Sequence, residues 1–146
     1  MVGLRPGWLV ALFAVGLVIS SWLPWLTTSA RGGGRASAIG GTLGSIALPP
    51  RFGAGQLIVL LSSMLIVLGA MAARELLSRL AAAAAVVISV LVVVLTWWYF
   101  HVNVVAPVAV GYGLYIGAVC ALGVLGCSVW ALVTAAPSGQ DRPLSA

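Results

Sequence analysis

Four apolar runs without a charged residue constrain this chain more than any other feature of its sequence. They cover about residues 8–25, 56–73, 80–100 and 108–136. Each run is close to the ~20 residues that a helix needs to cross the hydrocarbon core of a bilayer. Backbone groups in lipid must bond within their own segment, and the runs lack the alternation of membrane-barrel strands, so they predict helices. We therefore predict an all-α integral membrane protein, a bundle of four transmembrane helices.

The predicted bundle is a single transmembrane domain over residues 1–136, and residues 137–146 are expected to form a flexible cytoplasmic tail. A glycine-rich extracytoplasmic loop, residues 27–55, joins the first two runs. A tight turn over residues 74–79 joins the second and third. Because proline is favoured at the first position of a helix, Pro107 is predicted to start the last helix.

The composition excludes a soluble domain and a nucleic-acid-binding protein. Apolar residues make up 62% of the chain and charged residues 6%, against about 45–50% and about 25% in soluble domains. A small soluble domain leaves too much of its chain exposed to hide that much apolar surface. The net charge of +5 comes from scattered arginines, which do not form a nucleic-acid footprint. The expected partners are the lipid bilayer and other membrane-protein subunits.

The first run has a competing interpretation, which is a cleaved signal peptide. Arg5 precedes the run, and Thr28-Ser29-Ala30 resembles a small-residue cleavage site. The run is longer than the apolar region of a signal peptide, which has about 7–15 residues, and Pro24 interrupts the approach to the site. We expect the run to be retained as a membrane span.

Both termini are predicted to be cytoplasmic, in a multi-pass protein of the plasma (inner) membrane. An even number of spans places the termini on one side, and the short, arginine-bearing turn at 74–79 favours the inside. The arginines then divide into an inner set (Arg5, Arg74, Arg79 and Arg142) and an outer set (Arg31, Arg35 and Arg51). Aromatic residues gather near the outer boundary, and the predicted interfacial anchors are Trp22, Trp25, Trp97 and Trp98.

Side chains that could carry chemistry are few and far apart. Glu75 and Asp141 are the only carboxylates, and His101 is the only histidine. The third run separates Glu75 from His101 by roughly 30 Å or more, too far for an acid–base pair or a shared metal. Because no span contains an ionisable acid or base of the kind that relays protons, proton coupling is not expected either. We predict a non-enzymatic protein without catalytic residues, cofactor or metal.

The remaining polar residues are predicted to act locally. Glu75 and Arg79 are four apart and are expected to pair at a helix end. Cys120 and Cys127 are expected to pack as small apolar groups, since they are too far apart to form a disulfide with each other. Several polar residues inside the runs can bond to carbonyls of their own helix: Gln56, Ser62, Ser63, Ser89 and Thr96.

Two features are candidates for contacts with a partner. Gly113, Gly117 and Ala121 form a small-residue stripe on which another helix can approach closely; that helix belongs either to the same bundle or to a partner. The second feature is the 27–55 loop, which is long for a connector and is either partly ordered or disordered. Its expected contacts with a partner or with lipid headgroups involve Arg31, Arg35, Ile39, Leu43, Ile46 and Arg51.

The segment Ser21-Trp22-Leu23-Pro24-Trp25 carries a resemblance to a known group of proteins. A first helix that ends in this corner, followed by a glycine-rich outer loop and a tight arginine-bearing turn, resembles small four-helix membrane proteins of actinobacterial envelopes. Such proteins look like accessory subunits of larger assemblies, including the Mce-type lipid importers of mycobacteria. The resemblance implies an accessory or stabilising subunit in lipid transport, and it assigns no catalytic residue. The alternative is a small transporter or channel built by self-association.

Overall fold

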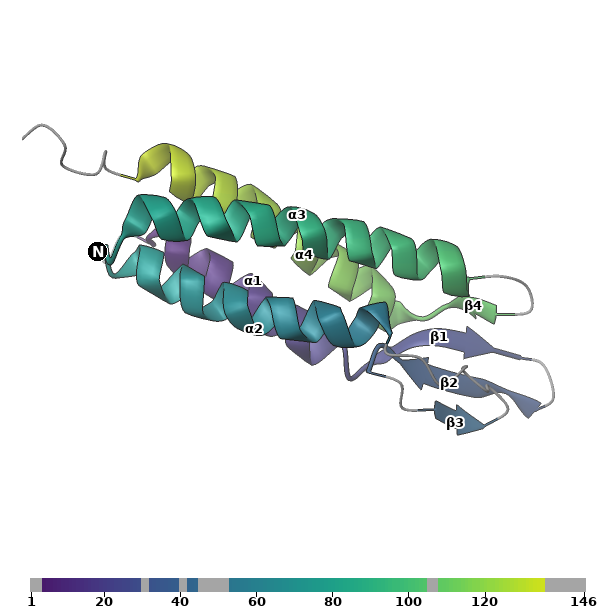
Figure 1. The fold of residues 1–146 in the computed structure, drawn as a ribbon. Coiled ribbons are helices and arrows are strands. Elements are labelled where there is room, and N and C mark those ends of the chain that lie inside the picture. The colour runs from purple at the N-terminus through teal and green to yellow at the C-terminus, as the bar shows by residue number, and fades with distance from the viewer. Residues whose placement is uncertain (1–3, 30–31, 40–41, 45–52, 105–107, 136–146) are drawn as a thin grey trace, which may run out of the picture.

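The computed structural model describes residues 4–29, 32–39, 42–44, 53–104 and 108–135 and combines helices with one small sheet (Figure 1). The helices are α1 (Pro6–Ser20), α2 (Ala54–Ala73), α3 (Ser78–Asn103) and α4 (Tyr112–Thr134). Three of them, α2, α3 and α4, are long and apolar enough to cross a membrane, whereas α1 is apolar but has only 15 residues. The chain is thus mostly helical, with three helices compatible with membrane insertion.

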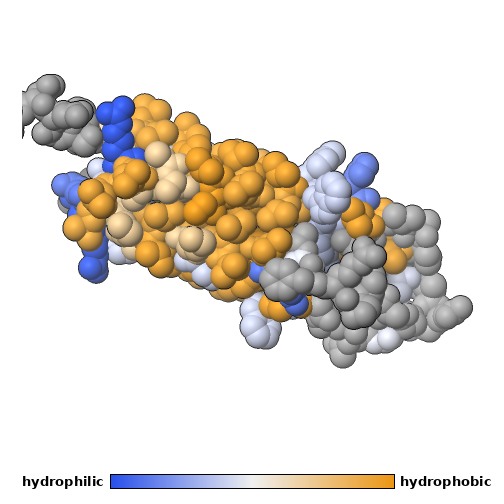
Figure 2. Space-filling view, in the orientation of Figure 1, coloured by the Kyte–Doolittle hydropathy of each residue, from blue (hydrophilic) through white to orange (hydrophobic). Residues whose placement is uncertain are grey.

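The helices form a bundle in which each packs against two neighbours. α1 and α3 each contact both α2 and α4. α1 and α2 approach closely, because a Cβ added to Gly7 would lie 2.6 Å from the carbonyl oxygen of Gly69. Large apolar side chains cover the outer surface of the bundle, and hydrophilic residues gather toward its two ends (Figure 2). An apolar belt of this kind is what a bilayer requires of an inserted bundle.

The sheet has four short antiparallel strands, β1 (Pro24–Thr28), β2 (Gly34–Ser37), β3 (Thr42–Gly44) and β4 (Val108–Val110), in the order β3-β2-β1-β4. β1 to β3 follow α1, whereas β4 comes from the connection between α3 and α4. The all-α prediction is therefore wrong at this end of the bundle. These strands are too short to produce a local hydropathy signal, and β4 is far from its partner β1 in the sequence.

Two predicted helix boundaries are wrong because strands begin where helices were expected to continue. The first helix ends at Ser20 rather than near Trp25, since the chain turns there and the backbone N–H of Leu23 bonds the Ser20 carbonyl. The last helix begins at Tyr112, because the segment just before it pairs as β4. Pro107 does not start it and lies outside the described residues, as does the predicted tail at 137–146.

The turn between α2 and α3 closes with a Schellman motif. The N–H of Leu76 bonds the Met71 carbonyl at 3.0 Å, and the N–H of Glu75 bonds the Ala72 carbonyl at 3.2 Å. Glu75 takes the left-handed position that glycine usually occupies, with φ 61°. The predicted pair between Glu75 and Arg79 is wrong, because Glu75 lies outside a helix and its carboxylate bonds Arg5 at 3.0 Å.

Predicted bonds between serine or threonine side chains and their own helix are confirmed. The hydroxyls of Ser62, Ser63, Ser89 and Thr96 donate to carbonyls three or four residues earlier. Gln56 departs from this prediction, because its side-chain amide donates to the Ile39 carbonyl at 3.3 Å. The first turn of α2 is thus linked to the segment that follows β2.

Candidate functional site

The junction between the sheet and the bundle is organised by Trp25. The pairing of β1 with β2 shifts register between Pro24 and Leu26, which marks an irregularity of the β-bulge kind at Trp25. A bulge adds one residue to a strand and turns a side chain away from its regular direction. Trp25 is fully buried as a result.

The buried indole of Trp25 has both a polar and an aromatic partner. Its N–H donates to the Ser20 carbonyl at 2.7 Å, and this oxygen, in the last residue of α1, also accepts the bond from the backbone N–H of Leu23. Its ring meets the ring of Tyr99 edge-on, with centroids 5.1 Å apart. The carbonyl of Trp25 accepts a 2.7 Å bond from the N–H of Gly111, at the start of α4. One residue therefore joins α1, α3, α4 and the sheet.

The predicted small-residue stripe faces this tryptophan. A Cβ added to Gly117 would lie 2.8 Å from Cζ2 of Trp25 and 3.0 Å from the Ser20 hydroxyl. One added to Gly113 would lie 2.9 Å from Cδ1 of the same ring. Ala121, one turn further along α4, is also buried. At the two glycines, then, the stripe receives the tryptophan of β1, whereas the sequence predicted the close approach of a helix.

The predicted anchors divide into one buried and three exposed tryptophans. Trp22, Trp97 and Trp98 are 74%, 67% and 62% exposed, so the structure places them where they can meet lipid headgroups or a partner. Trp25 is not an interfacial anchor, because the irregularity in β1 turns it into the core. Trp97 also stacks beside His101, with ring centroids 6.3 Å apart. We call the three exposed residues the aromatic rim.

The residues predicted to make outer contacts are only partly within the described chain. Arg35 lies in β2 with an exposed side chain, and Ile39 is half-buried where its carbonyl bonds Gln56. Leu43 belongs to β3. Arg31, Ile46 and Arg51 fall outside the described residues.

An apolar groove between α3 and α4 opens beside the aromatic rim. Its volume is about 250 Å³, and Trp97, Phe100, Tyr115 and Leu122 are among the residues that line it. Ala118 and Ala121 of α4 also line it. We call this hollow the α3–α4 groove. Sequence reasoning missed it, because it depends on how two helices pack rather than on a motif.

The groups with acid–base chemistry stay apart in the fold. Glu75 precedes α3 and His101 lies near its end, and the helix rises about 35 Å between Ser78 and His101. Cys120 and Cys127, both on α4, are free and partly buried. Within the residues that the structure describes, no group of three His, Cys, Asp or Glu side chains could hold a metal ion.

The sheet end therefore offers a surface of exposed aromatic residues and one arginine, supported from beneath by a buried tryptophan. Such a surface is suited to contact rather than to chemistry, since exposed aromatic side chains are enriched at protein interfaces and at membrane boundaries. No protein-family model matches the chain, and no match was found among curated proteins or solved structures.

Proposed function

We propose that the chain is a non-enzymatic accessory subunit of a multi-protein envelope membrane complex that handles lipid transport. The observation that carries the proposal is the aromatic rim beside the α3–α4 groove. Trp22, Trp97 and Trp98 present large apolar surfaces at the end where the sheet stands, and aromatic residues of this kind anchor interfaces. The corner at residues 21–25, with its resemblance to envelope subunits, supports the lipid-transport part.

The proposal includes four membrane spans, with α1 as the shortest. The outward face of α1 is apolar along its whole length, because Trp8, Leu12, Val15 and Ile19 are all exposed. Its 15 residues extend about 22 Å, and a short span is accommodated by local thinning of the bilayer. Arg5, Arg74 and Arg79 lie at the end opposite the sheet, which favours cytoplasmic termini under the positive-inside rule.

Cysteine labelling tests this topology. In a Cys120→Ser/Cys127→Ser background, a new cysteine at Ser37 should react with an impermeant reagent from outside, and one at Ser138 should not. Labelling at both positions from outside would contradict the proposed arrangement.

The accessory role is tested by substituting two tryptophans at opposite ends of the bundle. Trp97→Ala, at the aromatic rim, should reduce the yield of foreign subunits that co-purify from the native membrane. Trp130→Ala is the matched control, because Trp130 is 50% exposed on α4 but does not line the α3–α4 groove. An equal loss in both variants would show that the tryptophans act only as general membrane anchors.

The absence of chemistry is a separate part of the proposal. Glu75→Gln, His101→Ala and Cys120→Ser/Cys127→Ser should leave the parent process close to wild type, since removing a catalytic acid or base costs about two orders of magnitude or more. Deletion of the whole chain should lower partner abundance or transport flux. A single Glu75 or His101 substitution that abolishes the process in an assembled complex would favour a catalytic or ion-coupled role.

The α3–α4 groove also favours one alternative, a transporter or channel built by self-association. The small side chain of Ala118, which is half-buried in the groove, would let a helix of a second copy approach closely. Native mass spectrometry after mild extraction separates the two proposals. Foreign subunits support the accessory role, whereas complexes made only of copies of this chain support the alternative.

A further inference from the structure

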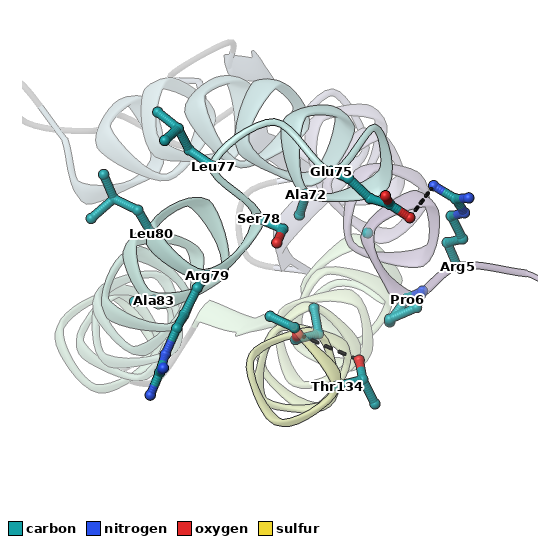
Figure 3. A pocket seen from close by; sticks show the side chains of 13 residues that line it. Arg5, Pro6, Ala72, Glu75, Leu77, Ser78, Arg79, Leu80, Ala83 and Thr134 are labelled. Carbon is teal, nitrogen blue, oxygen red and sulfur yellow. Dashed lines mark hydrogen bonds and ion pairs between the residues drawn. The ribbon is translucent and has the colours of Figure 1, made fainter. Parts of the chain in front are cut away.

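A larger cavity lies at the opposite end of the bundle, where the α2–α3 turn meets the beginning of α1 and the end of α4 (Figure 3). Its volume is about 820 Å³, and all four helices contribute to it. Small residues form its walls, among them Gly7, Ala72, Ala83 and Ala131. We call it the terminal cavity. Cavities of this size are typical of sites that hold small organic ligands.

Two arginines stand on different sides of the terminal cavity. Arg5, which precedes α1, donates to the Ala73 carbonyl at 2.9 Å and pairs with Glu75 at 3.0 Å. Arg79, in the first turn of α3, is exposed and makes no ion pair within the part of the chain that the structure describes. Figure 3 shows Arg5 and Glu75 pointing toward each other, while Arg79 extends from α3 on the other side. The lining carries one positive charge more than negative.

The backbone around the terminal cavity is held in an unusual conformation. Glu75 and Leu77 have φ values of 61° and 46°, and they are the non-glycine residues with positive φ in the described ranges. Both line the cavity. Glu75 holds the left-handed position of the Schellman motif, so the same turn that ends α2 also shapes this wall of the cavity.

One buried polar group close to the terminal cavity has no partner. The hydroxyl of Ser128 is fully buried and makes no hydrogen bond in the described chain. Ser128 precedes Ala131 by three residues and Ala135 by seven, so it lies on the same face of α4 as these two lining residues, about one turn deeper. A buried hydroxyl without a partner is costly. Ser128 does not itself line the cavity, so a polar group bound there would have to extend about one turn past Ala131 to satisfy this hydroxyl.

We propose that the terminal cavity binds the phosphate headgroup of an anionic phospholipid. The arginines supply charge-assisted hydrogen bonds to phosphate oxygens, and Arg5 keeps donors available because its contacts to Ala73 and Glu75 both use one nitrogen. The apolar walls and the lipid-facing helices beside them accommodate the glycerol and acyl portions, which a free phosphate ion lacks. Basic pockets between helices at a membrane surface are suited to such headgroups. This inference does not depend on the accessory role.

Native mass spectrometry of the full chain in a mild nonionic detergent tests the proposal with phosphatidylglycerol as the probe and phosphatidylcholine as the neutral comparison. Arg79→Gln should weaken phosphatidylglycerol binding about tenfold, the effect of losing a hydrogen bond to a charged group. Arg74→Gln is the matched control, because Arg74 is exposed beside the same turn but does not line the cavity. Equal weakening in both variants would show diffuse surface attraction and overturn the proposal.

A second pair of variants tests the cavity without changing its charge. Ala83→Leu should fill part of the hollow and weaken phosphatidylglycerol binding, whereas Ala84→Leu, at a half-buried neighbour that does not line it, should not. Unchanged binding in Ala83→Leu would overturn the proposal. Glycerol 3-phosphate distinguishes the source of the phosphate: weak binding supports the lipid, and binding as tight as that of phosphatidylglycerol would overturn the assignment to a lipid.

Discussion

The two ends of the bundle are lined by the same kinds of small residue, yet the sheet end is filled and the opposite end is hollow. At the sheet end, Gly113 and Gly117 face the fully buried ring of Trp25. At the opposite end, Ala83 and Ala131 face a cavity of about 820 Å³. Small residues in a membrane bundle allow a close approach of other groups. Whether the space beside the small residues is filled depends on the segment that joins the helices at that end. β1 places a tryptophan in it at the sheet end, whereas the turn at 74–77 places no comparable side chain in it at the other end.

The strongest test of this comparison removes the side chain that fills the sheet end. Trp25→Ala should lower the free energy of unfolding by about 3–5 kcal/mol, because it leaves a large cavity and removes one of the two hydrogen bonds to the Ser20 carbonyl. Unfolding in mixed detergent micelles measures the change. Trp22→Ala is the control, since its side chain is 74% exposed. Similar losses in the two variants would mean that Trp25 does not organise this end.

Overfilling the same end should have the next largest effect. Gly117→Leu should destabilise the chain by about 1–3 kcal/mol, because the new side chain meets the Trp25 ring and the Ser20 hydroxyl. Gly126→Leu lies on the same helix, and a Cβ there meets nothing within 4 Å. It should leave the melting temperature close to that of the parent. A stable Gly117→Leu variant would contradict the packing described for the junction.

At the hollow end, the backbone conformation of Glu75 predicts a smaller effect. Glu75→Gly and Glu75→Ala both remove the ion pair with Arg5, so their difference isolates the cost of the left-handed conformation. The glycine variant should be more stable by about 1 kcal/mol, since glycine adopts positive φ without a Cβ clash. Parallel thermal denaturation compares the two. Equal stabilities would show that the turn relaxes when the charge is removed.

The smallest expected effect sharpens the contrast between the ends. Ala83→Leu enlarges a side chain that lines the terminal cavity, and it should change the free energy of unfolding by less than about 0.5 kcal/mol because open space receives the added atoms. Ala85→Leu, two residues away in the packed core, should cost about 1–3 kcal/mol. Comparable losses would mean that the hollow end is as tightly packed as the core.

Sequence patterns predicted the local features of the fold better than those that join distant segments. The prediction of long apolar helices is confirmed in part, because three of the four helices are long and apolar enough to span. The serine-to-carbonyl bonds were also predictable, since donor and acceptor lie within one helical turn. The sheet was not, because β1 pairs with β4 across most of the chain and each strand has five residues or fewer.

In the candidate site, too, local features were predicted from the sequence and contacts between distant segments were not. Trp22, Trp97 and Trp98 were identified by composition near a predicted boundary, and the structure exposes all three. Trp25 is also a tryptophan and lies only three residues after Trp22, but it is buried. The register shift between β1 and β2 accounts for the difference. Glu75 pairs with Arg5 rather than with Arg79 because its own backbone is left-handed and takes it out of the helix. The rule that residues four apart lie side by side holds only within a helix. Tertiary contact, not local propensity, settles these positions.

The pairing of β1 with β4 has a consequence for the order in which the chain can be assembled. β1 follows the first helix and is synthesised early, whereas β4 directly precedes the last helix. The edge of β1 that bonds β4 therefore has no β4 to pair with until α2 and α3 have been synthesised. β4 (Val108–Val110) then pairs with β1, and the next residue, Gly111, donates its N–H to the Trp25 carbonyl. The sheet can therefore be completed only late in synthesis, because α2 and α3 lie between its two paired strands in the sequence.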